Sequence, residues 1–242
     1  MIVRGDKMIP GADRFIERLH QRGAKFLILT NTSLYTPADL AHRLQRSGIN
    51  VTADHIYTSG LATAAFLKCR KPNATAFVLG ESGLTEALHQ VGYVLTDRHP
   101  DYVVLGETSS YNYQHITQAI CLVKEGARSI GTNPDALSPG RGGVEPSCGA
   151  LAALVETAAG VRPYYIGKPN PVMMRTALRS LNEHSENAIM VGDRMDTDIR
   201  AGTVAGMETI LVLTGVTTRE KVTRFPYRPA RVASSVAELE RE

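Results

Sequence analysis

The sequence of 242 residues contains no tryptophan, and its three cysteines are Cys69, Cys121 and Cys148. An odd number of widely separated cysteines without metal-ligand spacing argues against a disulfide framework or a cysteine-based zinc site, and it indicates reduced thiols. No apolar run approaches the roughly 20 residues of a membrane span, and the initial Met-Ile-Val-Arg-Gly-Asp lacks the pattern of a signal peptide. We therefore expect a cytoplasmic protein without a membrane partner.

The excess of positive over negative charge is also small, because 27 lysines and arginines are offset by 24 aspartates and glutamates, which leaves a net charge of +3. The basic residues are scattered along the chain, whereas nucleic-acid-binding surfaces gather them on one face. The composition therefore argues against a nucleic acid partner. Hydrophobic residues make up 43% of the chain and charged residues 21%, which is typical of a globular protein with an adequate core.

Short apolar runs alternate with helical segments, the pattern of a doubly wound parallel (Rossmann-like) sheet in an α/β protein. One such series opens the chain and later resumes, and a second, complete in itself, lies between its two parts. We therefore predict a core domain of residues 1–73 and 161–242, with an inserted α/β domain at 74–160. We further expect helices at 13–22 and 171–181, a flexible loop at 138–143, the last strand at 209–215, and a polar tail with a short helix at 236–241.

The most informative segment is Ala188–Ile199, where a short buried strand is followed by a glycine and three aspartates. Asp193 directly follows the apolar run, and Asp196, Thr197 and Asp198 then open a helix, where Asp and Thr are ordinary N-cap residues. Capping alone needs fewer acids than this. Ligands of open α/β sheets bind at the carboxyl ends of the strands. Hard oxygen ligands at that position suit Mg²⁺, which takes one or two protein carboxylates together with water and substrate phosphate.

Two further strand ends carry polar residues. The strand at 25–31 closes with Thr30 and Asn31, and a strand near Tyr164 closes with Lys168. A lysine neutralises a phosphate oxygen as a point charge, and a hydroxyl orients another. Each residue also has an explanation without a ligand, because Lys-Pro is often a solvated strand end and Thr-Asn a turn former. Combined with the aspartates in a doubly wound order, they favour a site for a phosphate monoester.

Three segments resemble the second, third and fourth sequence motifs of the haloacid dehalogenase (HAD) superfamily, most closely its NagD-like phosphatases, which carry a large inserted cap. These segments are Leu29-Thr30-Asn31, Gly167-Lys168-Pro169 and Gly192–Asp198. The resemblance implies an Mg²⁺-dependent phosphatase that acts through an aspartyl-phosphate. It also implies a small phosphorylated metabolite as the substrate, either a nucleoside monophosphate or a sugar phosphate, with p-nitrophenyl phosphate as an artificial one.

The resemblance also implies roles for individual residues. Thr30 and Asn31 would bind phosphate, and Lys168 would stabilise it. Asp193 would hold Mg²⁺, and Asp198 would assist through the metal's coordination shell.

In this family the inserted domain is a cap that closes over the phosphate and excludes water. Asn133, Asp135 and the glycine-rich loop around Arg141 are candidates for substrate contact. A polar strand end and a flexible surface loop explain them equally well. A homodimer formed through the cap is a further expectation from the family.

The sequence departs from the family in one respect, because it contains no Asp-x-Asp-Gly, the first motif, which supplies the nucleophile and the general acid/base. Asp6 and Asp13 are poor substitutes, since one falls in a loop and the other at the start of a helix. In the family, the strand that carries this motif lies between the strands that end at Asn31 and Asp193. We therefore expect an N-terminally shortened chain in which two sheet edges are exposed.

Two functions from different classes follow from these observations. One is a phosphatase whose complete form is active, and the other is a catalytically silent relative that binds a phosphorylated ligand. A receiver-type domain also uses acids, a threonine and a Lys-Pro pair, but the order Thr30, Lys168, Asp193 and the large insertion argue against it. An NAD-binding domain is disfavoured because no strand is followed by Gly-x-Gly-x-x-Gly.

Overall fold

The structure is a computed structural model that describes residues 2–4, 7–140 and 143–241. The chain divides into two compact units. Unit 1 consists of residues 1–28, 39–56 and 168–242, and unit 2 consists of residues 29–38 and 57–167. The segment 74–160 falls inside unit 2, and its assignment as a cap stays a prediction. Among the described residues, no helix is both long and apolar enough to cross a bilayer.

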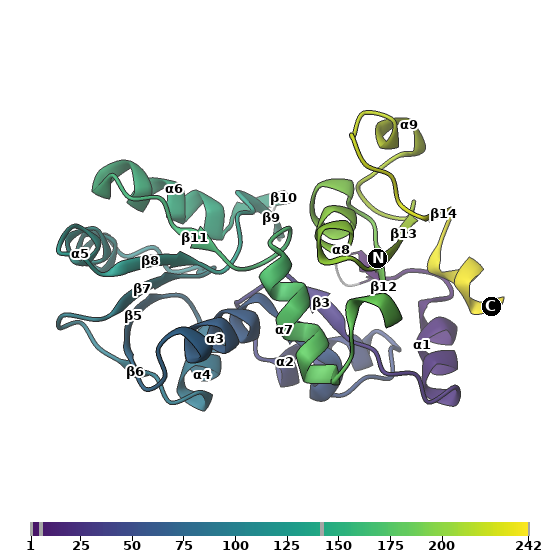
Figure 1. Cartoon of the computed structure of the whole chain (residues 1–242), viewed down its shortest axis with the longest axis horizontal. Helices are drawn as coiled ribbons and strands as arrows, with labels where there is room; N and C mark the ends of the chain where they lie inside the picture. The colour runs from purple at the N-terminus through teal and green to yellow at the C-terminus, as the bar shows by residue number, and fades with distance from the viewer. Residues whose placement is uncertain (1, 5–6, 141–142, 242) are drawn as a thin grey trace. The chain divides into compact units, whose positions relative to one another are not determined.

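Unit 2 is built on a five-stranded sheet in the order β11-β8-β7-β5-β6 (Figure 1). All four strand pairs are parallel. The strands are β5 (Thr75–Leu79), β6 (Val94–Leu95), β7 (Tyr102–Leu105), β8 (Arg128–Gly131) and β11 (Tyr164–Tyr165). This sheet confirms the predicted α/β class with a parallel sheet.

Helices cover both faces of this sheet. On one face lie α5 (Tyr113–Lys124) and α6 (Cys148–Ala159), and on the other α3 (Ser59–Arg70) and α4 (Ser82–Gln90) (Figure 1). Apolar side chains of β5 and β7 pack against α5 and α6 because residues two apart on a strand share a face. The buried members of this core are Phe77, Leu79, Val103, Leu105, Ala119, Leu122, Val123, Cys148, Leu151, Ala152 and Val155.

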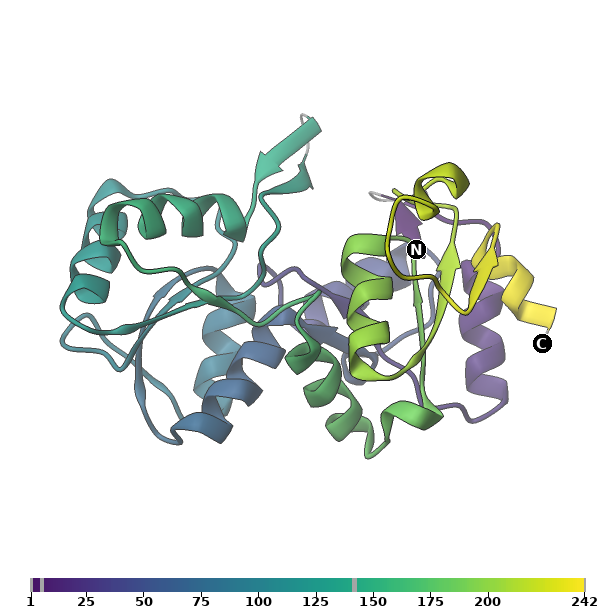
Figure 2. The same cartoon turned by 45° about the horizontal axis from the view of Figure 1, so that its top comes forward.

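A hairpin replaces part of the expected flexible loop. Strands β9 (Leu137–Gly140) and β10 (Gly143–Pro146) pair antiparallel, with Val144 opposite Pro139. Figure 2 shows this hairpin projecting from unit 2. The flexible-loop prediction is therefore wrong for these residues, while the interpretation of Arg141 lies outside the described residues. In the sequence, two short segments separated by two residues and flanked by glycine indicate a hairpin. The high glycine content of the segment instead led to the prediction of a flexible loop.

Unit 1 contains a parallel sheet in the order β12-β13-β14. Its strands are β12 (Ile189–Gly192), β13 (Glu208–Val212) and β14 (Arg231–Ala233). The prediction that the last strand lies at 209–215 is wrong, because β14 follows it in the expected polar tail. Strand β14 has only three residues and begins with Arg231, so it is too short to show as an apolar run, although Val232 and Ala233 pack into two different apolar clusters.

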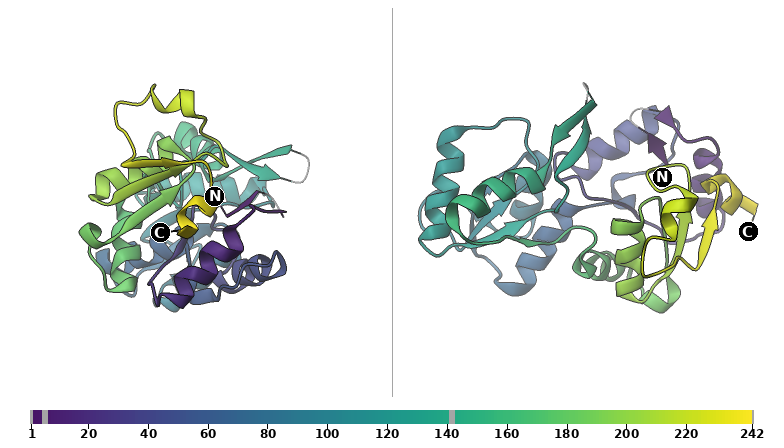
Figure 3. Two further views of the ribbon diagram at one scale, coloured as in Figure 1. Left: turned by 90° about the vertical axis from the view of Figure 1, so that its right-hand side faces the viewer. Right: turned by 90° about the horizontal axis from the view of Figure 1, so that it is seen from above.

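Unit 1 also contains a hairpin and several helices. They include the hairpin of β1 (Val3–Arg4) and β2 (Lys7–Met8), the helices α1 (Ala12–Gln21), α7 (Pro171–Leu181), α8 (Arg200–Ala205) and α9 (Arg219–Val222), and the 3₁₀ helix η4 (Val236–Arg241). The expected short helix at 236–241 is present as η4, and Val236 belongs to the same buried cluster as Ala12 and Ile16 of α1. Figure 3 shows η4 beside α1.

Three elements cross the boundary between the units, namely β3 (Ile28–Thr30), β4 (Ile56–Thr58) and α2 (Pro37–Arg46). Strand β3 pairs with β4, and β12 pairs with β13. Over the described ranges, β3 and β12 have no other strand partner. The predicted place of a first-motif strand beside them stays a prediction.

An aromatic cluster in unit 1 contains two histidines. The ring of Phe26 stacks on His55 with centroids 4.5 Å apart, and His20 meets His55 edge-on at 5.1 Å. His55 Nδ1 accepts a hydrogen bond from the backbone N–H of Thr52 at 3.1 Å, which requires an unprotonated Nδ1. Burial and the charge of His20 lower the pKa of His55 below its ordinary value of 6.5, against a smaller opposing effect of Asp54.

This cluster predicts a pH dependence of stability. Because the pKa of His55 is lower in the folded state, its contribution is fully present above about pH 6.5 and is lost as the pH falls through the folded-state value. Wild type should therefore lose more unfolding free energy between pH 7 and pH 5 than His55→Gln, which cannot titrate. Urea unfolding of both proteins at the two pH values measures this, and equal losses would contradict it.

Candidate functional site

The centre of the site in unit 1 is a buried ion pair. Lys168 Nζ donates to Asp198 Oδ1 at 2.8 Å, and the side chains are 11% and 9% exposed. Lys168 immediately precedes Pro169 and the N-cap Asn170 of α7, whose side chain accepts from the N–H of Val172. The capped start of α7 fixes the backbone just after the lysine, so the ammonium is presented from a rigid position.

Asp198 is placed by a π-helical turn, η3 (Met195–Ile199), that precedes α8. The N–H of Ile199 bonds to the carbonyl of Arg194 at 3.1 Å, five residues back. The turn brings Asp198 Oδ2 within 3.2 Å of the N–H groups of both Asp193 and Arg194. The structure does not support the alternative explanation that these residues only cap a helix, because Arg194 is the N-cap residue of η3 and the turn has no side-chain cap.

Two glycines leave the space that the aspartates occupy. A Cβ on Gly192 would lie 2.2 Å from Cβ of Asp198, and a Cβ on Gly215 would lie 1.8 Å from Asp193 Oδ2. Asp193 Oδ2 accepts from the N–H of Val216 at 3.2 Å, and the Asp193 carbonyl accepts from Thr217 N at 3.2 Å. Strand β12 and the loop after β13 therefore hold Asp193 from two sides.

The third acid of the segment is arranged differently. Asp196 forms a forked pair with Arg194, with contacts of 3.2 Å from Nε and 3.0 Å from a terminal guanidinium nitrogen. Burial acts to raise the pKa of Asp196, but the hydrogen bonds and charge of Arg194 lower it overall. Its side chain is 56% exposed, so this is a surface ion pair, and Asp196 differs in kind from Asp193 and Asp198.

The donor set suits a hard cation. Two neighbouring carboxylates, Asp193 and Asp198, provide oxygen ligands, and Mg²⁺ often binds through one or two carboxylates while keeping several waters. Among the described residues, no group of three or more histidines, cysteines or acids forms a metal cage. Asp198 already binds Lys168 and two N–H groups. This arrangement suits Asp193 for direct ligation and Asp198 for an orienting role.

In unit 2, the structure brings three predicted residues together. Asn31 Nδ2 donates to Asp135 Oδ2 at 2.7 Å, and the Asn31 carbonyl accepts from Asn133 Nδ2 at 2.7 Å and from Ser59 Oγ at 2.5 Å. Thr30 Oγ1 accepts from the N–H of Thr32 at 3.3 Å, which leaves its hydroxyl proton available as a donor. Asn133 is fully buried and bonds to the Asn31 backbone, and its predicted contact with substrate stays a prediction.

Comparison with known proteins identifies the family. Residues 1–94 match the family of haloacid dehalogenase-like hydrolases, and residues 165–239 match a family described as HAD-hydrolase-like. Over 239 residues the chain is 49% identical to dihydroxyacetone phosphatase from Corynebacterium glutamicum (strain R). This alignment covers 99% of the chain and 87% of the relative. The chain belongs to the haloacid dehalogenase-like hydrolases.

Within the HAD superfamily, the relatives place the chain among the NagD-like phosphatases. It is 42% identical to ribonucleotide monophosphatase NagD of Escherichia coli (strain K12), covering 99% of this chain and 94% of the relative. The solved structure of NagD from E. coli K-12 superposes with a TM-score of 0.94, at 41% identity and with 98% and 94% of the two chains covered. The p-nitrophenyl phosphatase from Archaeoglobus fulgidus superposes with a TM-score of 0.92, at 34% identity and 99% and 94% coverage.

The sequence did not point to four residues of this HAD phosphatase. Ser33, Glu107 and Ser147 are buried in unit 2, where both serines bond to Glu107, and Gly215 in unit 1 leaves the space that Asp193 occupies. Glu107 lies two residues after the apolar run of β7, and the aspartates that drew attention likewise follow a strand, β12. That strand-end signal could have found it, whereas Ser33 and Ser147 carry no signal in the sequence.

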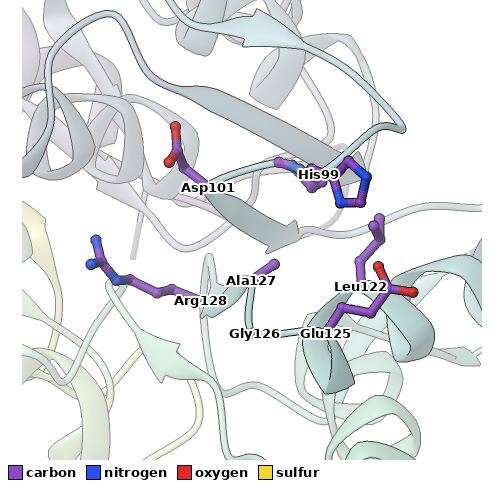
Figure 4. Close-up of a pocket in the computed structure, with 8 residues that line it drawn as sticks. His99, Asp101, Leu122, Glu125, Gly126, Ala127 and Arg128 are labelled. Atoms are coloured by element: carbon purple, nitrogen blue, oxygen red, sulfur yellow. The ribbon is translucent and has the colours of Figure 1, made fainter.

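A separate cavity of this HAD phosphatase lies in unit 2. It has a volume of about 240 Å³ and lies at the amino ends of β7 and β8, lined by residues that include His99, Asp101, Glu125 and Arg128 (Figure 4). The hydrogen bond from Lys71, followed by that from Thr75, lowers the pKa of Asp101. The predicted site residues lie at or after the carboxyl ends of strands, where ligands of such sheets bind. This cavity is therefore separate from the predicted phosphate site.

Proposed function

We propose that this HAD phosphatase uses Mg²⁺ to hydrolyse small phosphate monoesters in the cytoplasm. The observation that carries the proposal is the buried Lys168–Asp198 pair beside Asp193, because a fixed ammonium and hard oxygen donors serve phosphoryl chemistry. Relatives named for dihydroxyacetone phosphate, ribonucleotides and p-nitrophenyl phosphate support a small phosphorylated metabolite as the substrate class.

The proposed roles follow the chemistry of each side chain. The Thr30 hydroxyl and Asn31 would donate hydrogen bonds to the phosphate, and Lys168 would neutralise one of its oxygens. Asp193 would hold Mg²⁺, with Asp198 orienting the lysine and the metal's shell. When bound, the metal would withdraw charge from a phosphate oxygen. Asn133 and Asp135 would act on substrate through Asn31.

The nucleophile is the remaining part of the mechanism. The family resemblance implies an aspartyl-phosphate, and its Asp-x-Asp-Gly motif does not occur among these 242 residues. We propose that turnover requires a strand carrying this motif, added beside β12. The 242 residues alone would bind phosphate and Mg²⁺ without hydrolysing an ester.

Binding of inorganic phosphate tests the proposal independently of turnover. Isothermal calorimetry with Mg²⁺ should detect one phosphate per chain, and Thr30→Val should weaken it about tenfold, the usual value of one hydrogen bond to a charged group. Thr75→Val is the matched control, because Thr75 lies at the amino end of β5. No binding by wild type, or equal affinity in Thr30→Val, would contradict the proposed site.

A further inference from the structure

Glu107 is a buried carboxylate with a reciprocal pair of hydrogen bonds to Ser33, 74 residues away in sequence. The backbone N–H of Ser33 donates to Glu107 Oε2 at 2.8 Å, and the N–H of Glu107 donates to Ser33 Oγ at 3.0 Å. Glu107 is 7% exposed and Ser33 is fully buried. Burying a carboxylate costs free energy unless its oxygens accept hydrogen bonds, so the partners of Glu107 are needed to keep it buried.

The second oxygen of Glu107 reaches a different element. Ser147 Oγ donates to Glu107 Oε1 at 2.7 Å, and Ser147 is the N-cap residue of α6. The positive end of a helix dipole favours an anion at its N-terminus, which suits this carboxylate. One side chain therefore bridges the segment that follows β3 and the start of a 12-residue helix.

The same helix start is tied to Asn31 by a second route. Gly149 N donates to the Asp135 carbonyl at 2.8 Å, and the Asp135 carboxylate accepts from Asn31 Nδ2 at 2.7 Å. Ser33 Oγ also lies 3.2 Å from Thr132 Oγ1. The segment Asn31–Ser33 is thus connected at both ends to the N-terminus of α6. Asp135 makes the connection at Asn31, and Glu107 makes it at Ser33.

We infer that Glu107 is the positioning residue of the phosphate-binding segment. The inference rests on the proposed function, since it takes Thr30 and Asn31 as the phosphate ligands. Glu107 touches no substrate in this role. It fixes Ser33, and with it the direction in which the preceding residues present their hydrogen-bond donors. Small displacements of such donors weaken binding strongly, because hydrogen bonds depend steeply on distance and angle.

The side-chain chemistry separates positioning from simple charge. In Glu107→Gln, the amide oxygen can still accept from Ser33 N while the amide nitrogen donates to Ser147 Oγ. Glu107→Asp keeps the charge, but it is one methylene too short to span both partners. Positioning therefore predicts that Gln preserves phosphate binding and that Asp impairs it.

The test measures two quantities on the full chain of each variant. With Mg²⁺ present, the dissociation constant for inorganic phosphate should rise about tenfold in Glu107→Ala and Glu107→Asp, and less than about threefold in Glu107→Gln. By NMR, the amide proton of Ser33 should exchange faster with solvent in the Ala and Asp variants. Glu81→Ala is the matched control, because Glu81 also follows a strand of this sheet and bonds to Thr108.

The outcomes distinguish the positioning role from the proposed function. If wild type binds no phosphate, the proposed function fails, while the exchange of Ser33 still tests the hold by Glu107. If wild type binds phosphate and Glu107→Asp binds it equally with unchanged Ser33 exchange, the positioning role is overturned. If Glu107→Ala does not fold, the comparison of Glu107→Asp with Glu107→Gln decides between positioning and a simple charge effect. Equal impairment of phosphate binding in these two variants would contradict positioning.

Discussion

The variant Asp198→Ala is expected to lose about 3–5 kcal/mol of unfolding free energy, the usual cost of removing one partner from a buried ion pair. It would leave the Lys168 ammonium, which is 9% exposed as a residue, without its carboxylate. It would also remove the acceptor for the N–H groups of Asp193 and Arg194. Urea unfolding at pH 7 measures the loss.

Two comparisons make this prediction specific. Asp196→Ala, in the exposed pair with Arg194, should cost less than about 1 kcal/mol. The double variant Lys168→Met/Asp198→Leu should regain much of the lost stability, because apolar pairs often replace buried ion pairs without net cost. A loss in Asp198→Ala as small as that in Asp196→Ala would contradict the buried-pair description.

Asp193→Asn is expected to weaken Mg²⁺-dependent phosphate binding by about 100-fold or more, because even residues beyond the direct ligands of a metal often contribute 10–100-fold. The substitution is nearly isosteric, and the amide oxygen can still accept from Val216 N, so stability should change little. Calorimetric titration with phosphate at fixed Mg²⁺ measures the loss.

The control for this prediction lies in the same turn. Asp196→Asn removes an equal charge three residues away, yet its carboxylate is paired with Arg194 at the surface. It should leave phosphate affinity within about threefold of wild type, a difference below 1 kcal/mol. Equal losses in the two variants would mean that general acidity of the turn, and not ligation by Asp193, determines binding.

Local signals in the sequence located much of this fold. The helix predicted at 171–181 coincides with α7, because Asn170 is a capping residue and Pro171 suits the first helical position. The alternation of apolar runs and helices predicted the parallel sheets, and the motif around Asp193 predicted the family. In each case the information lies within a few neighbouring residues.

Features that depend on distant partners could not be predicted in this way. The bond from Ser33 to Glu107 joins residues 74 apart, and the short strand β14 pairs with β13, whose last residue lies 19 positions earlier. In the sequence, Met195–Ile199 cannot be distinguished from an ordinary helix start. In the structure it is a π turn in which Asp198 accepts hydrogen bonds from the N–H groups of Asp193 and Arg194. The joint action of Thr30, Asn31, Lys168, Asp193 and Asp198 on one phosphate stays a prediction.

The measurement that tests the central claim most directly is p-nitrophenyl phosphate hydrolysis with Mg²⁺. It compares this chain with one extended at its amino end by a strand carrying Asp-x-Asp-Gly, and with an extended control whose first aspartate is asparagine. We predict hydrolysis by the extended chain alone, and its loss on Asp193→Asn. Hydrolysis by the 242-residue chain at the rate of the extended one would contradict the account, because the nucleophile would then lie among these residues.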